Sequence, residues 1–382
     1  MPADEVQRWL DSGKPAGVAG LLLRPQEHPC LNGMPMSIQR GQAEAFFLTE
    51  ASGQRWICKK FLAGRSPDLG YLTAVSMLVP GHEGFRAATA RKLLTAGDLQ
   101  RQPGLYSNRK LGAWLQGTLL MPRIGGVDWT SLADEIRDGH IHPSSEHRLA
   151  LCRHLAELVH LLEQVQCSHR DLSCGNLLID LASCAVNFID FDSLYHPNLV
   201  IPAVTTCGTA GYTAPWTWRN GNLDATTTWA PHADRFALAI LSAEFLLVEA
   251  GSVLTGEGGV FCQDELHARQ GPGITAAHEQ LRRSFPAAAP LLTAALQAGG
   301  FDDCPSPEDW LRFAGAAGFP RPPQLDELEK ISAADFERIL LKRRPPAILW
   351  PAPELSDLQM PDFATRRPQP VAVTLPPNPW GP

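Results

Sequence analysis

The chain has 382 residues, 44% of them hydrophobic, so it is long enough for two domains and can bury a sizeable core. Its net charge of -7 gives no basis for binding nucleic acid or an anionic membrane surface, both of which need clustered Lys and Arg. The nine cysteines are scattered and lack the spacing of a zinc site, which favours reduced thiols and a cytoplasmic protein.

Strand patterns dominate the first part of the chain. Residues 1–35 read as an N-terminal extension with a short helical pattern followed by Gly and Pro. From residue 36 the segments MSIQRG, AEAFFLTE and RWICKKF predict successive strands of an antiparallel sheet. Helical periodicity follows over 82–97, and a buried strand over 117–124 is stopped by Pro122. We therefore expect a small β-rich domain over residues 36–121.

Helices dominate the second part, which we place at residues 122–320. Periodicity predicts helices over 145–164, 234–249, 276–284 and 307–314. The most apolar run, 236–248, is shorter than the roughly 20 residues that span a bilayer and contains Glu244, so it reads as a buried core helix. Residues 321–382 form a Pro-rich tail that we expect to be extended unless something binds it. The predicted fold class is α+β.

One stretch carries a dense set of polar residues. In CSHRDLSCGNLLID, Asp171 is followed by Asn176, and Asp190 comes after a second short apolar segment. Residues 177–179 and 186–189 read as the two strands of a hairpin, which would bring Asn176 and Asp190 to the same end. Carbonyl and carboxylate oxygens are the ligands that Mg²⁺ prefers, so this pair predicts a magnesium site.

The order of these residues resembles the eukaryotic-type protein kinase superfamily, in the divergent form found in bacteria. The pattern H-R-D-x-x-x-x-N ends at Asn176, and G-T-x-x-Y-x-A-P, a stretch that positions a peptide acceptor, matches residues 208–215. The resemblance covers about residues 36–318 and implies a bilobal fold with a small β-rich lobe and a larger helical lobe. It also implies that Asp234 ties the catalytic loop to the core.

The resemblance assigns roles residue by residue. Asp171 matches the catalytic base, Arg170 the arginine before it, and Asn176 and Asp190 the ligands of Mg²⁺. Lys59, in the strand WICK, matches the lysine that binds the phosphates of ATP, with Lys60 as the alternative if the register slips by one. The residues implied to contact ATP lie on the strands and the inter-lobe hinge: Gly41, Ala43, Ala45, Ile57, Lys59, Met121, Arg123 and Ile124.

Three departures from the family pattern stand out. Two glycines of the phosphate-covering loop are replaced by Ala43 and Ala45, and alanine restricts backbone angles that glycine allows. In the family a helix glutamate pairs with the lysine, and the best candidate here is Glu83. The glycine that follows it disfavours a helix at this position. Asp192 replaces the glycine of D-F-G and is an alternative metal ligand to Asp190.

The resemblance implies an Mg-ATP-dependent protein kinase that transfers the γ-phosphoryl group to Ser or Thr hydroxyls of a protein substrate. Two alternatives stay open: a pseudokinase scaffold that binds nucleotide weakly, and a small-molecule phosphotransferase. The implied partners are the substrate and a phosphatase or regulator protein, with no nucleic acid and no membrane. A phosphate on Thr205 or Thr206 could pair with Arg170 and order the segment that follows Asp190.

Overall fold

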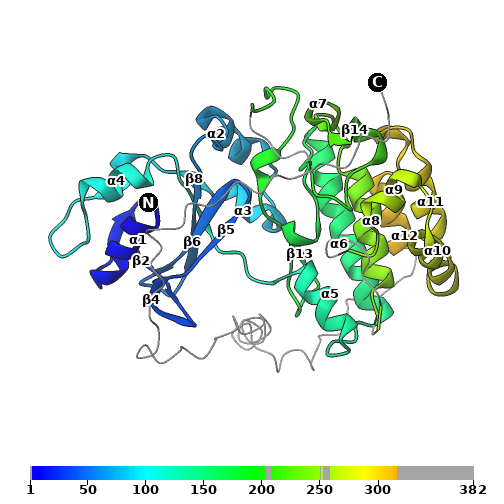
Figure 1. Ribbon diagram of the computed structural model, residues 1–382, viewed down its shortest axis with the longest axis horizontal. Helices are drawn as coiled ribbons and strands as arrows, with labels where there is room; N and C mark the ends of the chain where they lie inside the picture. The colour runs from blue at the N-terminus through cyan, green and yellow to red at the C-terminus, as the bar shows by residue number, and fades with distance from the viewer. Residues whose placement is uncertain (1, 204–207, 220, 250, 253–258, 316–382) are drawn as a thin grey trace, which may run out of the picture. The chain divides into compact units, whose positions relative to one another are not determined.

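The computed structural model describes residues 2–203, 208–219, 221–249, 251–252 and 259–315. These residues form a mixed α+β fold, in which most strands come early and most helices later in the chain (Figure 1). The Pro-rich tail expected over 321–382, and both Thr205 and Thr206, lie outside the described residues.

The first part of the chain forms a curled antiparallel sheet. The strand order is β8-β10-β7-β6-β2-β1-β9, and β5 pairs with β6. The strands predicted over MSIQRG, AEAFFLTE and RWICKKF are confirmed as β5, β6 and β7, and the strand predicted over 117–124 as β10. The strands are β1 Ala16–Val18, β2 Leu21–Pro25, β5 Ser37–Arg40, β6 Ala43–Glu50, β7 Arg55–Phe61, β8 Lys92–Leu93, β9 Leu99–Gln100 and β10 Leu119–Pro122.

Alternation along β6 and β7 gives the sheet two different faces. Phe46 is opposite Cys58 in the register, so both point to one face, and both belong to the same buried apolar cluster. Helix α4 (Arg109–Leu115) adds Trp114 to this cluster, with its ring 5.4 Å from that of Phe46. Because the apolar core lies on this face, the neighbouring residues of the two strands, such as Lys59, point to the other face.

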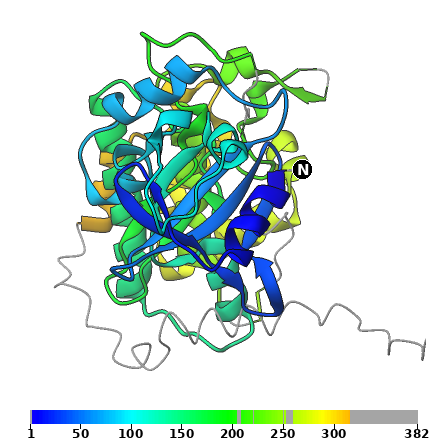
Figure 2. The ribbon, with the colours of Figure 1, turned by 90° about the vertical axis from the view of Figure 1, so that its left-hand side faces the viewer.

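Residues 1–35, set apart as an extension by the sequence pattern, contribute to this same core. Strand β2 pairs with β6, while β3 (Glu27–His28) and β4 (Leu31–Pro35) form a small hairpin. Helix α1 (Pro2–Asp11) buries Val6 and Trp9 in the apolar cluster, and Figures 1 and 2 both show it beside the early strands. Strands β1 and β2 are only three and five residues long, which leaves too short an alternation to recognise in the sequence.

The segment between β7 and β10 differs from the expected helix over 82–97. Its longest helix is α2 (Leu69–Leu78), which begins where the Asp68 side chain accepts the first free backbone N–H groups. The short turns η1 (Glu83–Phe85), α3 (Arg86–Thr89) and η2 (Ala96–Asp98) follow it. Gly84 packs closely in this turn: a Cβ there would come within 2.6 Å of the Leu158 side chain, which would have to shift.

The second part of the chain is mainly helical. Helix α6 (Ser145–Gln164) packs against α8 (Arg235–Leu247) and α12 (Pro307–Gly315). The helices predicted over 145–164, 234–249, 276–284 and 307–314 are confirmed, although the third begins earlier, as α10 (Pro272–Ser284). The other helices and turns are α5 Trp129–Arg137, η3 Cys174–Asn176, η4 Phe191–Ser193, η5 Pro215–Thr217, α7 Ala225–Thr228, α9 Gln263–Ala268, α11 Ala289–Gln297 and η6 Phe301–Asp303. Two short strands, β14 Trp218–Arg219 and β15 Asn222–Leu223, pair with each other.

A three-stranded sheet connects the polar residues singled out in the sequence. β12 (Leu177–Ile179) pairs with β13 (Val186–Phe188) and with β11 (Val127–Asp128). The predicted hairpin is therefore confirmed. In its register Leu177 is opposite Phe188, so the residues just before β12 and just after β13 lie at the same end.

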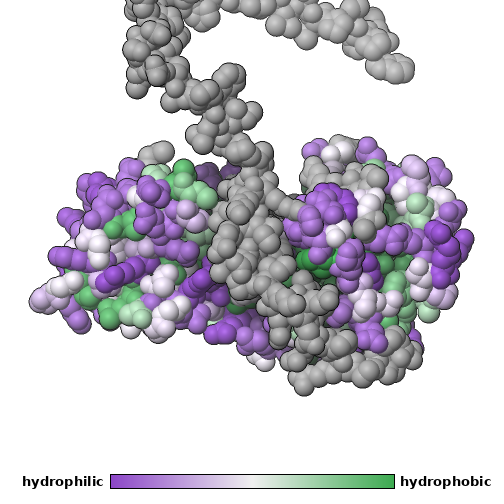
Figure 3. Space-filling model, turned by 90° about the horizontal axis from the view of Figure 1, so that it is seen from below, coloured by the Kyte–Doolittle hydropathy of each residue, from purple (hydrophilic) through white to green (hydrophobic). Residues whose placement is uncertain are grey.

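Within the described residues, no helix combines the length and the apolar character needed to cross a membrane. Helix α8 is thoroughly buried, with residues 236–247 all inside the core, so the prediction of a core helix is confirmed. The face of the molecule in Figure 3 is largely hydrophilic, with small hydrophobic patches scattered over it.

Helix α8 also buries one carboxyl group, that of Glu244. It accepts hydrogen bonds from Trp129 Nε1 at 3.0 Å, from the Tyr212 hydroxyl at 3.1 Å and from the backbone N–H of Val260 at 3.0 Å. Burial raises the pKa of Glu244 to about 7, although these donors act in the opposite direction. Glu244 thus joins three separate segments around α8.

This burial predicts a pH-dependent stability. Between the ordinary glutamate pKa of 4.5 and the folded-state value of about 7, the folded protein holds a proton on Glu244 that the unfolded chain has released. The free energy of unfolding therefore falls as pH rises through this window. In Glu244→Gln, which is neutral, we expect stability relative to the wild type to rise by on the order of 2 kcal/mol between pH 5 and pH 8. Urea denaturation at both pH values measures this; parallel pH curves for the two proteins would contradict it.

Candidate active site

The residues expected to contact ATP gather on the sheet face opposite the apolar core. In the register Ala45 is opposite Lys59, and Ile57, two residues away from Lys59, is opposite Met121. Residues that are directly opposite, or two apart on one strand, share a face. Ala43, two residues from Ala45, belongs to the same face. The structure therefore brings these five expected contact residues together on one surface.

The two alanines that replace glycines occupy regular strand positions. Ala43 and Ala45 both lie in the extended strand β6, whose backbone angles alanine adopts without strain. Gly41, in the turn between β5 and β6, has a φ of +49° and is the position that favours glycine. The loss of the two glycines thus introduces no backbone strain in this strand.

The end of strand β10 contributes the expected hinge residues. Arg123 donates its backbone N–H to the carbonyl of Arg55 at 3.0 Å, which continues the pairing of β10 with β7 by one residue. Its guanidinium lies 5.2 Å from the ring centroid of Phe47, which is opposite Ile57 and therefore on the same face of the sheet. Ile124 follows directly and is partly buried.

The register decides between the two candidate lysines. Lys59 Nζ lies 2.7 Å from Asp190 Oδ1 and 2.5 Å from Asp192 Oδ2. Lys60 points the other way and donates to the backbone carbonyls of Trp114 and Gln116, each at 2.7 Å. Burial acts against the ammonium form of Lys59, yet the two carboxylates raise its pKa above the ordinary value. Lys59, and not Lys60, is therefore the lysine that reaches the carboxylates of this site.

A second group of residues lies on the loop between α6 and β12. The carboxylate of Asp234, which directly precedes α8, accepts the backbone N–H of His169 at 2.6 Å and of Arg170 at 2.8 Å. Burial raises the pKa of Asp234 to about 7, while the two N–H donors favour the ionised form. Asp234 fixes the loop directly ahead of Asp171, as the sequence resemblance implies.

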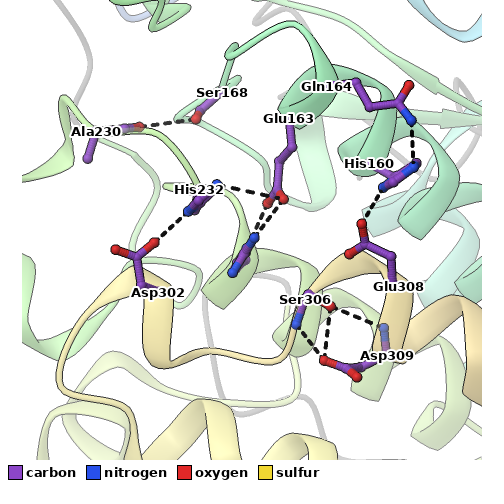
Figure 4. Close-up of polar contacts among 11 residues, drawn as sticks. His160, Glu163, Gln164, Ser168, Ala230, His232, Asp302, Ser306, Glu308 and Asp309 are labelled. Atoms are coloured by element: carbon purple, nitrogen blue, oxygen red, sulfur yellow. Dashed lines mark hydrogen bonds and ion pairs between the residues drawn. The ribbon is translucent and has the colours of Figure 1, made fainter.

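The segment that carries Asp234 is itself tied to helix α6 and to the turn η6 (Figure 4). Arg235 donates to both carboxylate oxygens of Glu163, at 2.8 Å each. His232 Nδ1 lies 2.5 Å from Asp302 Oδ1. A bidentate contact between Arg and carboxylate fixes direction as well as distance, so this network sets where Asp234 meets the loop.

His169 acts as a buried spacer between the loop and the hairpin. Its Nε2 lies 2.8 Å from the carbonyl of Ile189, and its Nδ1 lies 3.3 Å from the backbone nitrogen of Asp171. Burial lowers the pKa of His169 to about 4. A neutral ring that donates from Nε2 and accepts at Nδ1 satisfies both contacts. This holds the backbone of Asp171 against the end of β13.

Arg170 is buried, and its guanidinium is surrounded by protein acceptors. It donates to the carbonyls of Ser193 and Thr228 at 2.9 Å and of Ala225 at 3.2 Å, and to the hydroxyl of Thr228 at 2.8 Å. It also lies 4.7 Å from the ring centroid of Trp229. No phosphate is needed to satisfy these donors, so the expected pairing with a phosphothreonine gains no support from this geometry.

Asp171 and Asn176 are joined within the loop. Asn176 Nδ2 donates to the backbone carbonyl of Asp171 at 2.7 Å, which leaves its amide oxygen as the end that can bind a cation. The Asp171 carboxylate accepts the hydroxyl of Thr209 at 2.8 Å. Burial raises the pKa of Asp171 to about 7. Thr209, which the sequence offered only as part of the 208–215 motif, thus contacts the expected base directly.

Asp190 completes the group from the other side of the hairpin. The backbone N–H of Ile189 donates to the carbonyl of Asn176 at 3.0 Å, which places Asp190 one residue beyond this contact. Asp190 has a left-handed backbone with φ +65° and ψ +56°, which turns its side chain out of the strand direction. The side chain is 41% exposed and can be reached from solvent.

Asp190 and Asn176 fit a magnesium ion by their chemistry. Both offer hard oxygen atoms, and Mg²⁺ commonly takes only one or two protein ligands beside water and phosphate oxygens. Across the described parts of the chain, no group of three or more His, Cys, Asp or Glu side chains is arranged to hold a metal. A two-ligand site completed by phosphate oxygens is a different arrangement, and Asp190 and Asn176 are compatible with it.

Glu83 is not brought to Lys59, so the expected pair is wrong. The Glu83 side chain is 77% exposed and pairs with Arg86 on the same turn. The reason is the position of the helix: α2 lies earlier in the chain than expected, and its sequence LGYLTAVSML contains no acidic residue.

Asp192, expected as an alternative metal ligand, instead binds two cations of the protein. One of its oxygens meets Lys59 and the other meets Arg91. Sequence reasoning missed Arg91, because its partner is 101 positions away and no local pattern marks the contact.

Neither a scan against models of protein families nor a search of curated proteins finds a match to this chain. The function is therefore inferred from the positions of the side chains described above.

Removing the Asp234 carboxylate should loosen the loop and destabilise the fold. In Asp234→Ala the backbone N–H groups of His169 and Arg170 lose their buried acceptor, which we expect to cost about 2–4 kcal/mol of unfolding free energy. Urea denaturation at pH 7.5 measures this. Asp134→Ala is the matched control because it removes a 44% exposed carboxylate that pairs with Arg137 on its own helix, for less than about 1 kcal/mol. Equal losses in both variants would show that Asp234 has no special role.

Proposed function

We propose that this chain is a protein kinase with the bilobal kinase fold, which uses Mg-ATP to phosphorylate Ser or Thr hydroxyls of a protein substrate in the bacterial cytoplasm. The observation that carries the proposal is the meeting of Lys59, from strand β7, with Asp190, beside the loop that holds Asp171 and Asn176. A phosphate-binding cation, two oxygen ligands and a carboxylate base are the parts that phosphoryl transfer requires.

Two roles concern the nucleotide. Lys59 carries a positive charge toward the nucleotide phosphates from the sheet face that also holds Ile57 and Met121. Asn176 and Asp190 offer oxygen ligands to Mg²⁺, which when bound neutralises charge developing on the transferred phosphoryl group.

The third role concerns the acceptor hydroxyl. Asp171 accepts a hydroxyl hydrogen bond from Thr209 and can accept one from an acceptor hydroxyl in the same way. Burial raises the pKa of Asp171 to about 7, which suits proton transfer near neutral pH. Asp171 is therefore the proposed base.

A protein acceptor is favoured over a small molecule by the order of segment 208–215. Thr209 contacts Asp171, and the Gln263 side chain accepts the backbone N–H of Gly211 at 2.6 Å and the hydroxyl of Thr213 at 3.1 Å. These contacts hold segment 208–215 beside the proposed base. In the resembling family this segment positions a peptide.

A pseudokinase scaffold is the second candidate. It is favoured by the direct contact of Asp190 with Lys59, since an aspartate held by a lysine is less free to bind a metal. Against it, Asp190 is the more exposed of the two carboxylates bound to Lys59, and Asp171 and Asn176 are both present in the loop. The two functions differ in one measurable property, the transfer of phosphate.

Replacing the proposed base should abolish transfer and spare binding. We expect Asp171→Asn to lower the rate of phosphate incorporation into protein by about 10²- to 10⁴-fold, because it removes the proton acceptor but keeps the shape of the side chain. The assay combines labelled ATP, Mg²⁺ and a cell lysate as the source of acceptor proteins. The thermal shift produced by Mg-ATP should persist in this variant, since the lysine and the oxygen ligands are intact.

Asp180→Asn is the matched control, because it makes the same change at an exposed position just after β12. It should transfer phosphate at the wild-type rate. If the wild-type protein shows a nucleotide-dependent thermal shift but labels no protein, the scaffold is favoured. Labelling of a small molecule and no protein would favour the phosphotransferase instead.

A further inference from the structure

Lys59 meets two carboxylates whose surroundings are very different. Asp190 Oδ1 is 2.7 Å away and its side chain is 41% exposed, whereas Asp192 Oδ2 is 2.5 Å away and its side chain is only 12% exposed. Asp192 is therefore the partner that stays enclosed by protein, whichever way the more exposed Asp190 turns. A lysine that must point at a nucleotide needs a fixed partner of this kind.

Asp192 is held on its second oxygen by a buried arginine. Arg91 Nη1 lies 3.3 Å from Asp192 Oδ1, and the Arg91 side chain is only 3% exposed. Arg91 Nη2 also donates to the carbonyl of Leu72 in helix α2 at 2.8 Å. Asp192 is thus fixed between two cations and connected through one of them to α2.

A second contact ties the same two segments together. The hydroxyl of Tyr71, also in α2, donates to the carbonyl of Leu194 at 2.7 Å, and both groups are buried. Leu194 directly follows the turn η4, which carries Asp192. The position of Asp192 relative to α2 is therefore set by side chains on both sides of it.

Asp192 supplies the kind of carboxylate that helix α2 lacks. In the resembling family a glutamate of the helix that packs beside the lysine strand pairs with that lysine, and transfer requires the pair. Helix α2 has no acidic residue, and Glu83 is exposed and bound to Arg86. Asp192 supplies a carboxylate to the lysine from a different segment.

We propose that Asp192 is the positioning residue that holds Lys59 toward the nucleotide phosphates, in place of the absent helix glutamate, and that Arg91 locks Asp192 in this orientation. The inference rests on the proposed function, because it assigns Lys59 to the phosphates. It removes Asp192 from the candidate metal ligands, since both of its oxygens are already bound by cations. The pair formed by Lys59 and Asp192 then couples α2, through Arg91, to the catalytic geometry.

The kinetic test is the substitution Asp192→Asn, which keeps the shape and removes the charge. We expect kcat for protein phosphorylation to fall by about 10- to 100-fold, because a displaced Lys59 no longer meets the phosphates in the reacting geometry. The KM for ATP should change much less, since removing a negative charge near the phosphates favours binding while the lost orientation opposes it. Asp192→Glu keeps the charge and should retain more activity than Asp192→Asn.

A second readout needs no turnover. In thermal denaturation without nucleotide, Lys59→Met and Asp192→Asn each remove one side of a buried ion pair, so their effects should not add: the double variant should melt no lower than the worse single variant. The control is the more exposed pair of Lys92, in strand β8, and Asp98, in the turn η2, which form an ion pair of 2.6 Å. Asp98→Asn should leave kcat unchanged, because this pair does not contact Lys59.

The outcomes separate the inference from the proposed function. If the wild type transfers phosphate and Asp192→Asn keeps kcat within about twofold, or if the two melting effects add, Asp192 does not position Lys59 and the inference is overturned while the kinase function stands. If the wild type transfers no phosphate to any protein, the proposed function fails, and this role of Asp192 fails with it.

A further variant keeps the inference testable if Asp192→Asn does not fold. The double substitution of Asp192→Asn with Arg91→Gln also removes the buried cation that would be left without its carboxylate. Its kcat should fall by about 10- to 100-fold relative to the wild type. A kcat within about twofold of the wild type in this protein would overturn the inference.

Discussion

The arrangement of the candidate site depends on one group of charges. Lys59, Arg91 and Asp192 are largely enclosed by protein, and the more exposed Asp190 contacts Lys59 from the solvent side. An enclosed charge left unpaired costs several kcal/mol, so none of the three enclosed groups can be removed without consequence for the others. The group also joins strand β7 to the end of the β12–β13 hairpin. The sheet face that carries Lys59 is thereby held against the loop that carries Asp171.

A second constraint fixes that loop from the opposite side. Asp234 binds two successive backbone N–H groups, and its own segment is held by the bidentate contact of Arg235 with Glu163 in α6. Helix α6 is buried along much of its length and packs on α8, so the anchor is rigid. His169, on the same loop, connects it to the hairpin through its hydrogen bond with the carbonyl of Ile189. The polar site is accordingly built on packed helices.

Local sequence signals predicted the elements that have strong, uninterrupted patterns. Helix α6 has twenty residues with clear periodicity and a serine cap at Ser144, and the β12–β13 hairpin has two short apolar runs separated by a turn. The partner of Lys59 was not predictable in the same way. Helix α2 is apolar over most of its length and shows little periodicity, so the sequence pattern favours a helix later in the chain, with Glu83 as the partner of Lys59. The contact between Arg91 and Asp192 joins residues 101 positions apart and leaves no local signal.

Two departures from the kinase pattern, which in the sequence look like separate losses, belong together in space. Helix α2 contains no acidic residue, and the position after Phe191 carries an acid where the pattern has glycine. A carboxylate at position 192 is enclosed by protein and repelled by Asp190. Burial, and in part the charge of Asp190, accordingly raises the pKa of Asp192. Lys59 and Arg91 both contact Asp192 and offset this cost, and helix α2 offers no acidic residue that would compete for Lys59. Under the proposed function, the missing helix glutamate and the added aspartate are one change in the position of a negative charge. The sequence alone does not reveal this, because the two positions are far apart along the chain.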